Sequence, residues 1–138
     1  MEIVPLGDSA LIVRVGDSLG EVLALQAKLE AAALPGVDDI VPAFASVAVF
    51  FQSPAQLAAG RAAIETALRG RKRGHKAALR PRLVEVPVCY DAEFALDLET
   101  VARHCRLSPN DVVARHSAGR YDVRCVGFTP GFPFLGGL

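Results

Sequence analysis

The sequence lacks several patterns that mark extracellular, metal-binding or membrane proteins. Its three cysteines are odd in number and none forms a CxxC pair, which argues against a disulfide framework and against a zinc site. No basic segment followed by an apolar one opens the chain, and no run approaches the roughly 18 apolar residues of a membrane span. These features favour reduced thiols and a soluble chain in the cytoplasm.

Signature motifs of phosphate and metal chemistry are missing as well. The chain contains no Walker A loop, no GxGxxG and no HExxH, so we expect it to bind no cofactor and no metal ion alone. The adjacent Asp38 and Asp39 fall at a predicted strand start, where neighbouring side chains point apart, and no histidine precedes His75. We interpret the two acids as solvated turn carboxylates.

Formal charge is zero overall but unevenly distributed. Residues 1–68 carry 3 basic and 8 acidic groups, residues 69–82 carry 7 and 0, and residues 83–138 carry 5 and 7. A basic stretch with glycine and proline could be a nucleic-acid patch or a solvated linker. No aromatic residue lies among these charges and the flanks are acidic, so we interpret residues 71–82 as a linker between two domains and expect no nucleic-acid partner.

The first 70 residues predict a small α+β domain. Strands are indicated where β-branched and aromatic residues cluster between turn residues, over residues 2–6, 10–15, 39–44 and 47–51. Helices are indicated from Ser18 and Ser53, each followed three residues later by Glu or Gln, the capping-box spacing. The order ββαββα fits a two-layer sandwich with two helices on one face of an antiparallel sheet. We expect a packing or docking module.

The second half begins with a predicted strand over residues 83–90, where valines alternate with other residues, and ends with another over residues 121–128. Two short predicted helices, begun by Asp97 and Ser108, lie between these strands. The helix pair also resembles a helix-turn-helix. Its neighbouring strands, and only four arginines against three acids over residues 97–120, argue against DNA binding.

His116 is the candidate catalytic residue. A histidine beside Ser117 and near an apolar loop could act as an acid, a base or an anion ligand. A lone helical histidine is more often a hydrogen-bonded structural residue, and no motif places a base beside it. Arg115 and Tyr121 are further candidates, because a carboxylate substrate would need a hydrogen-bond donor nearby.

The last thirteen residues form the most specific pattern in the chain. They contain four glycines, two prolines and three of the seven phenylalanines. Glycine permits positive φ, proline fixes φ, and phenylalanine supplies a rigid apolar face. The pattern fits either a shaped loop that lines a pocket or interface, or a barrel corner that buries aromatics. The candidate binding residues here are Gly127, Phe128, Thr129, Pro130, Gly131, Phe132 and Phe134.

Several segments together resemble one protein family. They are Gly7-Asp8-Ser9-Ala10-Leu11, Leu34-Pro35-Gly36-Val37 with Val41-Pro42, Val86-Pro87-Val88-Cys89-Tyr90, Leu107-Ser108-Pro109 with His116-Ser117, and Gly127-Phe128-Thr129-Pro130-Gly131-Phe132-Pro133-Phe134-Leu135-Gly136-Gly137-Leu138. In this order they resemble the family of the 5-oxoprolinase B subunit (PxpB), also labelled allophanate hydrolase subunit 1 or the kinase inhibitor KipI.

The resemblance implies an N-terminal α+β domain followed by a cyclophilin-like β-barrel. It also implies a C-type partner subunit with a second barrel and an A-type subunit, which together open 5-oxoproline to L-glutamate with ATP. This chain would be a non-catalytic or site-completing subunit, inactive alone. A KipI-like inhibitor of a sensor histidine kinase shares the same motifs, so this alternative stays open.

The family continues beyond the last loop, so we expect a truncated chain with an incomplete barrel. About eight strands of ~5–6 residues with connections of ~4–6 need roughly 80 to 100 residues. Residues 83–138 number only 56. An unfinished sheet would expose unpaired edges together with Phe128, Phe132 and Phe134, so we expect oligomers or poor solubility.

Overall fold

The computed structural model describes residues 1–70 and 82–137. Of these, residues 1–70 and 122–136 form a first unit, and residues 82–121 with Gly137 form a second. The predicted linker lies outside the described residues apart from Arg82. The domain boundaries drawn from the sequence therefore stay a prediction.

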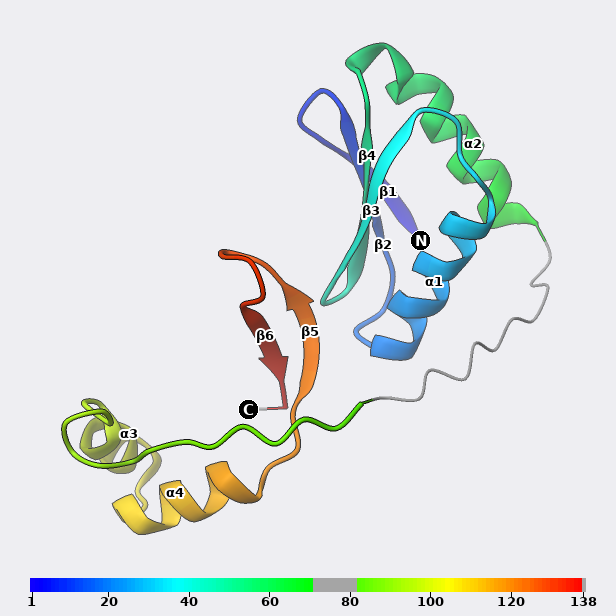
Figure 1. Ribbon diagram of the computed structural model, residues 1–138. Coiled ribbons are helices and arrows are strands. Elements are labelled where there is room, and N and C mark those ends of the chain that lie inside the picture. Colours follow the sequence, from blue (N-terminus) through cyan, green and yellow to red (C-terminus); the bar gives the residue numbers. More distant parts are fainter. Residues whose placement is uncertain (71–81, 138) are drawn as a thin grey trace. The chain divides into compact units, whose positions relative to one another are not determined.

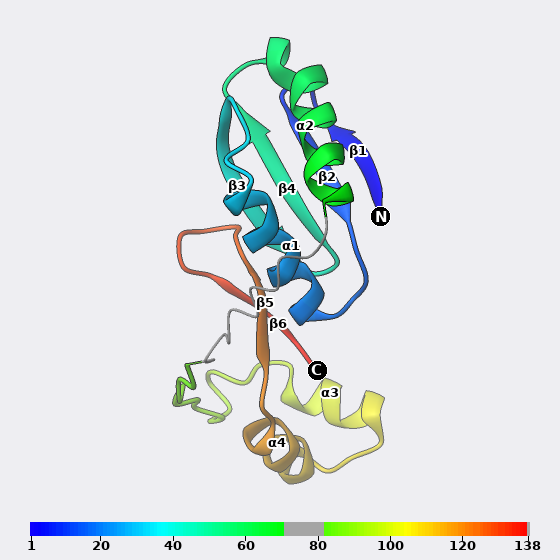
Figure 2. The same cartoon turned by 90° about the vertical axis from the view of Figure 1, so that its right-hand side faces the viewer.

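The first unit is built on a four-stranded antiparallel sheet. Its strands are β1 (Glu2–Leu6), β2 (Ala10–Arg14), β3 (Val37–Ala43) and β4 (Ser46–Phe51). Figure 1 shows this sheet nearly edge-on, and Figure 2 shows its strands in the order β1-β2-β4-β3. Gly7 has a φ of 67° in the turn between the first two strands, a value that glycine adopts without steric cost. All four predicted strands are confirmed.

Two helices cover one face of this sheet. They are α1 (Leu19–Ala31) and α2 (Leu57–Arg69), the latter entered through a 3₁₀ turn, η1 (Pro54–Gln56). Figure 2 shows both helices on the same side of the four strands. The predicted ββαββα two-layer sandwich is confirmed.

The two predicted capping boxes have different outcomes. At the second helix, the main-chain N–H of Ser53 donates to Oε1 of Gln56 at 3.2 Å, as predicted. At the first, the prediction is wrong, because the Ser18 side chain forms no cap hydrogen bond with any described residue. The Glu21 carboxylate lies instead against Gly16, where a Cβ would collide with it.

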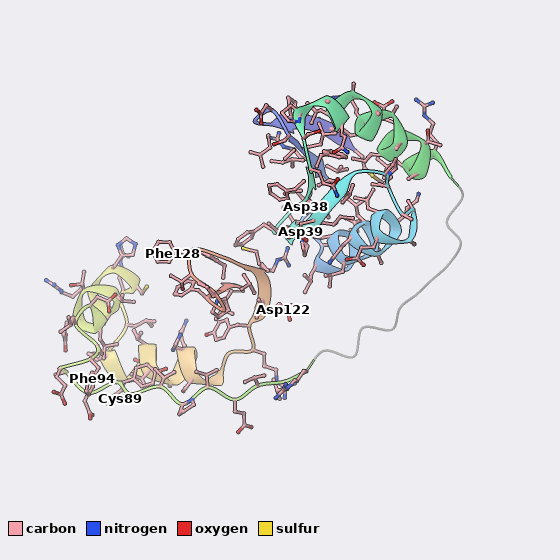
Figure 3. The ribbon with its side chains drawn as sticks, turned by 45° about the horizontal axis from the view of Figure 1, so that its top comes forward. Asp38, Asp39, Cys89, Phe94, Asp122 and Phe128 are labelled. Carbon is pink, nitrogen blue, oxygen red and sulfur yellow. The ribbon has the colours of Figure 1, made fainter. Side chains whose placement is uncertain are left out.

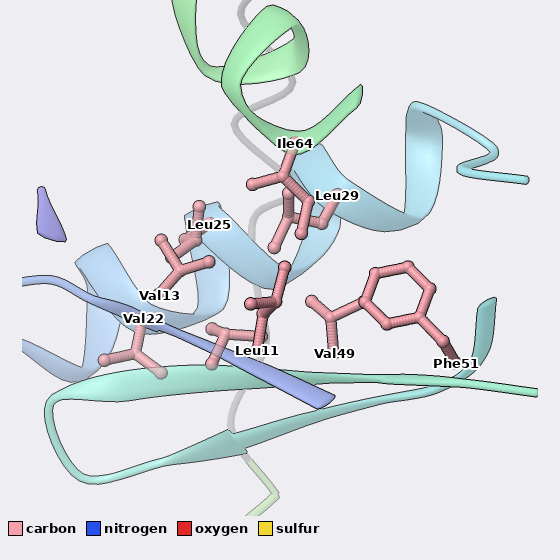
Figure 4. Packing of buried hydrophobic residues seen from close by; sticks show 9 residues of the cluster. Leu11, Val13, Val22, Leu25, Leu29, Val49, Phe51 and Ile64 are labelled. Atoms are coloured by element: carbon pink, nitrogen blue, oxygen red, sulfur yellow. The ribbon is translucent and has the colours of Figure 1, made fainter. Parts of the chain in front are cut away.

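Apolar side chains from both layers form the core of the first unit (Figure 4). Alternate residues of the two central strands meet the inward faces of the two helices. The cluster comprises Leu11, Val13, Val22, Leu25, Leu29, Val47, Val49, Phe51 and Ile64. Burying one such side chain contributes about 1.5–3 kcal/mol relative to leaving it exposed, so this cluster is a large favourable contribution to folding of the sandwich.

The second unit contains two short helices, α3 (Leu98–Cys105) and α4 (Pro109–Ala118). Arg106 ends the first of them in a left-handed conformation with a φ of 56°. The strand predicted over residues 83–90 is wrong, because this fully described segment is irregular and its alternating valines are exposed. A strand needs a pairing partner, and in the described part of the chain none pairs with this segment.

The C-terminal stretch of the first unit forms a β-hairpin. Strand β5 (Asp122–Val126) pairs antiparallel with β6 (Pro133–Gly136). The first strand confirms the strand predicted over residues 121–128, in a shorter form. The second lies inside the segment predicted as a loop. No helix within residues 1–70 and 82–137 is long and apolar enough to cross a bilayer.

Candidate functional site

His116 lies in the last turn of α4 and is held by an aromatic pair within the second unit. The Tyr90 hydroxyl lies 2.5 Å from His116 Nδ1, although 26 residues separate them in the sequence. The Tyr90 ring meets the imidazole edge-on, with centroids 5.8 Å apart, and the Tyr121 ring lies 5.7 Å away at a tilt of 35°. The imidazole is therefore positioned from two directions while its residue stays exposed.

Tyr121 also completes the end of the same helix. Its hydroxyl donates to the His116 carbonyl at 2.9 Å, and this carbonyl also accepts from the Gly119 N–H at 3.3 Å, so two donors close the last turn of the helix. The Tyr121 ring folds back over Gly119, where a Cβ would collide with the phenol group. Glycine at this position thus allows the tyrosine to reach the helix.

The beginning of α4 is fixed by a reciprocal cap. Asp111 N–H donates to the Ser108 hydroxyl oxygen at 3.1 Å, and the Ser108 hydroxyl and N–H donate to the Asp111 carboxylate at 2.6 and 3.3 Å. These bonds lower the pKa of Asp111 below its ordinary value of 3.8. The bond from the Ser108 hydroxyl has the larger effect, and the bond from the Ser108 main-chain N–H has the next largest. The predicted helix start at Ser108 is confirmed, and it anchors the helix that carries His116.

Arg115 is exposed on this helix beside His116, and its positive charge further lowers the pKa of Asp111. The neighbouring Ser117 hydroxyl donates back to the Val113 carbonyl at 2.8 Å. The three candidate residues predicted in this unit are Arg115, His116 and Tyr121. The structure brings His116 and Tyr121 together by a ring contact and by a hydrogen bond to the His116 carbonyl. Tyr90, the third member of the cluster, was not predicted.

The glycine-rich segment of the first unit forms the turn between β5 and β6. Its main chain closes on itself, because Gly127 N–H donates to the Phe132 carbonyl at 3.1 Å and Phe132 N–H donates to the Thr129 carbonyl at 3.1 Å. Phe128 and Gly131 have positive φ values of 66° and 81°. The predicted loop is therefore shaped by its own hydrogen bonds.

Three phenylalanines of this hairpin form a chain of edge-to-face contacts. The centroids of Phe128 and Phe132 are 6.0 Å apart, and those of Phe132 and Phe134 are 5.3 Å apart. All three are exposed, as predicted, and Phe128 is 90 % exposed at the turn (Figure 3). An exposed apolar cluster of this kind is typical of a surface that binds a partner.

Arg124 of β5 connects this hairpin to the sandwich. Its guanidinium donates to the carbonyls of Asp17 and Phe44, and the Phe44 N–H donates back to the Arg124 carbonyl at 3.3 Å. A mainly apolar pocket of about 320 Å³ lies alongside, between α1, β3 and β5. Its walls include Leu19, Leu23, Val41, Pro42, Val123 and Cys125. The sequence contained no local signal for this anchor.

The remaining polar residues have simpler surroundings. Asp38 and Asp39 are exposed, as predicted, but they lie within β3 and not in a turn (Figure 3). The three cysteines are unpaired in the described chain. No group of three or more His, Cys, Asp or Glu side chains that could hold a metal ion occurs among the described residues.

A family model described as "Carboxyltransferase domain, subdomain C and D" matches residues 1–138. The chain belongs to this family. It is 38 % identical over 151 aligned positions to the B subunit of 5-oxoprolinase from Bacillus subtilis (strain 168), covering 99 % of the chain and 63 % of the relative. The B subunit of 5-oxoprolinase from Escherichia coli O157:H7 is 37 % identical over 105 positions, covering 76 % of the chain and 47 % of the relative.

Solved structures of this carboxyltransferase-domain family share the fold. The crystal structure of TTHA0988 in space group P6522 superposes with a TM-score of 0.64 at 36 % identity, covering 92 % of the chain and 24 % of that protein. The chain thus spans less than two thirds of the length of these relatives. The match confirms the family resemblance and the mixed α/β fold.

Proposed function

We propose that the chain acts as the B-type subunit of a 5-oxoprolinase, the complex that converts 5-oxoproline to L-glutamate with ATP. The observation that carries this proposal is the 38 % identity to the B subunit of a 5-oxoprolinase over 99 % of the chain. In this proposal an A-type subunit supplies the ATP chemistry and a C-type subunit supplies a second barrel. The chain itself contributes structure and completes the site.

The exposed aromatic chain of the hairpin supports a subunit role. Partner-binding surfaces are enriched in aromatic side chains that are already rigid before binding. Phe128, Phe132 and Phe134 contact one another and stand on a turn closed by its own main-chain hydrogen bonds. We propose that this surface, including Gly127, Thr129, Pro130 and Gly131, contacts the C-type subunit.

The His116 cluster supports a contribution to the substrate site. It is the place in the second unit where aromatic rings and a hydrogen bond hold an exposed, ionisable side chain in one orientation. Such preorganisation is what a binding or catalytic group requires. Arg115, exposed on the same helix, would add positive charge for a carboxylate substrate.

The test is ATP-dependent release of glutamate from 5-oxoproline by the matching A-type and C-type proteins. Turnover is measured with this 138-residue chain, with a version extended to the length of its relatives, and with neither. The proposal expects turnover to require one of the two B-type proteins. If neither version restores turnover, the proposal is wrong, and inhibition of a sensor histidine kinase becomes the function to assay.

A further inference from the structure

We infer that Tyr90 holds neutral His116 in the tautomer that carries its proton on Nε2, so that the ring presents an N–H donor to solvent and binds a carboxylate oxygen. The tautomer follows from the geometry of the second unit alone. The choice of a carboxylate as ligand rests on the proposed function, since 5-oxoproline and glutamate both carry this group. The two parts can be tested separately.

The chemistry of the pair identifies the donor. A phenol O–H is a stronger hydrogen-bond donor than a neutral imidazole N–H, and an unprotonated imidazole nitrogen is a stronger acceptor than a phenol oxygen. The Tyr90 hydroxyl lies 2.5 Å from His116 Nδ1, so the hydroxyl donates and Nδ1 accepts. In a neutral imidazole one nitrogen accepts and the other carries the proton. The proton therefore resides on Nε2.

The surroundings leave Nε2 available to a ligand. No hydrogen bond joins it to another side chain or main-chain group in the residues that the structure describes, and His116 is exposed. The tyrosine rings on two sides restrict rotation of the imidazole. A donor held in one orientation loses little entropy when a ligand binds.

Two arginines lie close to His116 in the sequence. Arg115 precedes it and also acts on the Asp111 carboxylate, and Arg120 follows four residues later, both exposed. An N–H donor with positive charge nearby matches a carboxylate, which only accepts hydrogen bonds. With the opposite tautomer, Nε2 would be an acceptor and would repel the carboxylate oxygen, which is also an acceptor.

The first experiment measures the tautomer. Two-bond ¹H–¹⁵N NMR spectra of the full chain, at a pH of about 8 where an ordinary histidine is neutral, distinguish protonated from unprotonated ring nitrogens. We expect an Nε2–H signal pattern for His116 and a shift toward a mixture of tautomers in Tyr90→Phe. Tyr121→Phe is the matched control, since its hydroxyl bonds the His116 carbonyl and not the ring. An Nδ1–H pattern in the wild type, or no change in Tyr90→Phe, would overturn the inference.

The second experiment measures the ligand. 5-Oxoproline should shift the His116 ring signals, whereas 2-pyrrolidinone, the same lactam without a carboxylate, should not. Tyr90→Phe should weaken this binding about threefold to tenfold, the range of one neutral hydrogen bond, while circular dichroism shows an unchanged fold. Equal shifts by both lactams, or by neither, would overturn the ligand assignment. Intact binding without turnover in the complex would instead refute the proposed function alone.

Discussion

The ring of Phe51 in β4 lies directly against Gly60 in α2, in the space that a Cβ on this glycine would need. Phe51 is 5 % exposed and part of the core, so its ring cannot move aside without displacing other buried side chains. The contact leaves no room for a side chain at this position of α2. Glycine, a poor helix former, is therefore required here by packing.

Replacing this glycine should destabilise the sandwich. Gly60→Ala gains about 1 kcal/mol of helix propensity, but overpacking a tight core costs about 1–3 kcal/mol. We expect a net loss in the free energy of unfolding, measured by urea denaturation. The matched control is Gly20→Ala in α1, where the nearest atom to the new Cβ would be Ser18 Oγ at 3.7 Å. The control substitution should raise the free energy of unfolding. A similar rise for both substitutions would contradict the packing argument.

The core of the sandwich should be intolerant of truncation. Leu29 of α1 is 0 % exposed, so Leu29→Ala removes buried methyl groups and leaves a cavity. We expect a loss of about 2–5 kcal/mol in the free energy of unfolding. Leu96→Ala, at a residue that is 85 % exposed, should change it by less than about 0.5 kcal/mol. Thermal denaturation followed by circular dichroism compares the two, and equal losses would refute the assignment of the core.

How far the sequence predicts this fold depends on whether the signal is local. The strands of the first unit were predicted because β-branched and aromatic residues cluster between turn residues that sit next to them in the chain. The segment with Val84, Val86 and Val88 was predicted from its alternating valines, but it has no partner strand in the described residues and is irregular. In β6, Pro133 and Gly136 weaken the strand signal, so that strand was missed.

The candidate site also contains residues that a local pattern predicted and residues that it did not. His116 and the phenylalanines were predicted from residue types within one short segment. Tyr90 lies 26 residues from His116, and Arg124 lies 80 residues from Phe44, so neither contact leaves a local pattern. Only the three-dimensional structure brings these pairs together. Their functional roles stay predictions that the experiments above would test.

Loss of Arg124 should release the hairpin from the sandwich. Arg124→Ala removes the guanidinium bonds to the carbonyls of Asp17 and Phe44. Because the arginine contact is exposed, we expect its loss to lower the stability of the hairpin contact by about 1 kcal/mol or less. This loss should be seen as faster hydrogen exchange at the Phe44 N–H. Arg14→Ala, which breaks only an exposed ion pair with Glu2, should leave that amide unchanged. Unchanged exchange in the Arg124 variant would show that the guanidinium is not the anchor.

The stabilising effect of the Asp111 cap on α4 should depend on pH. The Ser108 bonds lower the pKa of Asp111 in the folded state below the ordinary value of 3.8. The ionised carboxylate therefore stabilises the folded chain fully at pH values above this ordinary, unfolded-state pKa. The stabilisation is lost as the pH falls through the lower pKa of the folded state. An NMR titration of the Asp111 carboxyl carbon measures the shift. In Ser108→Ala the first cause is removed, so the pKa should rise toward 3.8. An unaltered titration in this variant would refute the assigned cause.

The phenylalanine cluster should govern self-association of the isolated chain. Phe128 is 90 % exposed, so Phe128→Ser removes apolar surface without opening the core. We expect the wild type to form oligomers by light scattering, and the variant to form fewer at the same concentration, with an unchanged melting temperature. Leu96→Ser, at an exposed leucine outside the cluster, is the control and should leave association as it was. A monomeric wild type at high concentration would contradict the prediction, and equal effects of both substitutions would assign association to general hydrophobicity instead of to this surface.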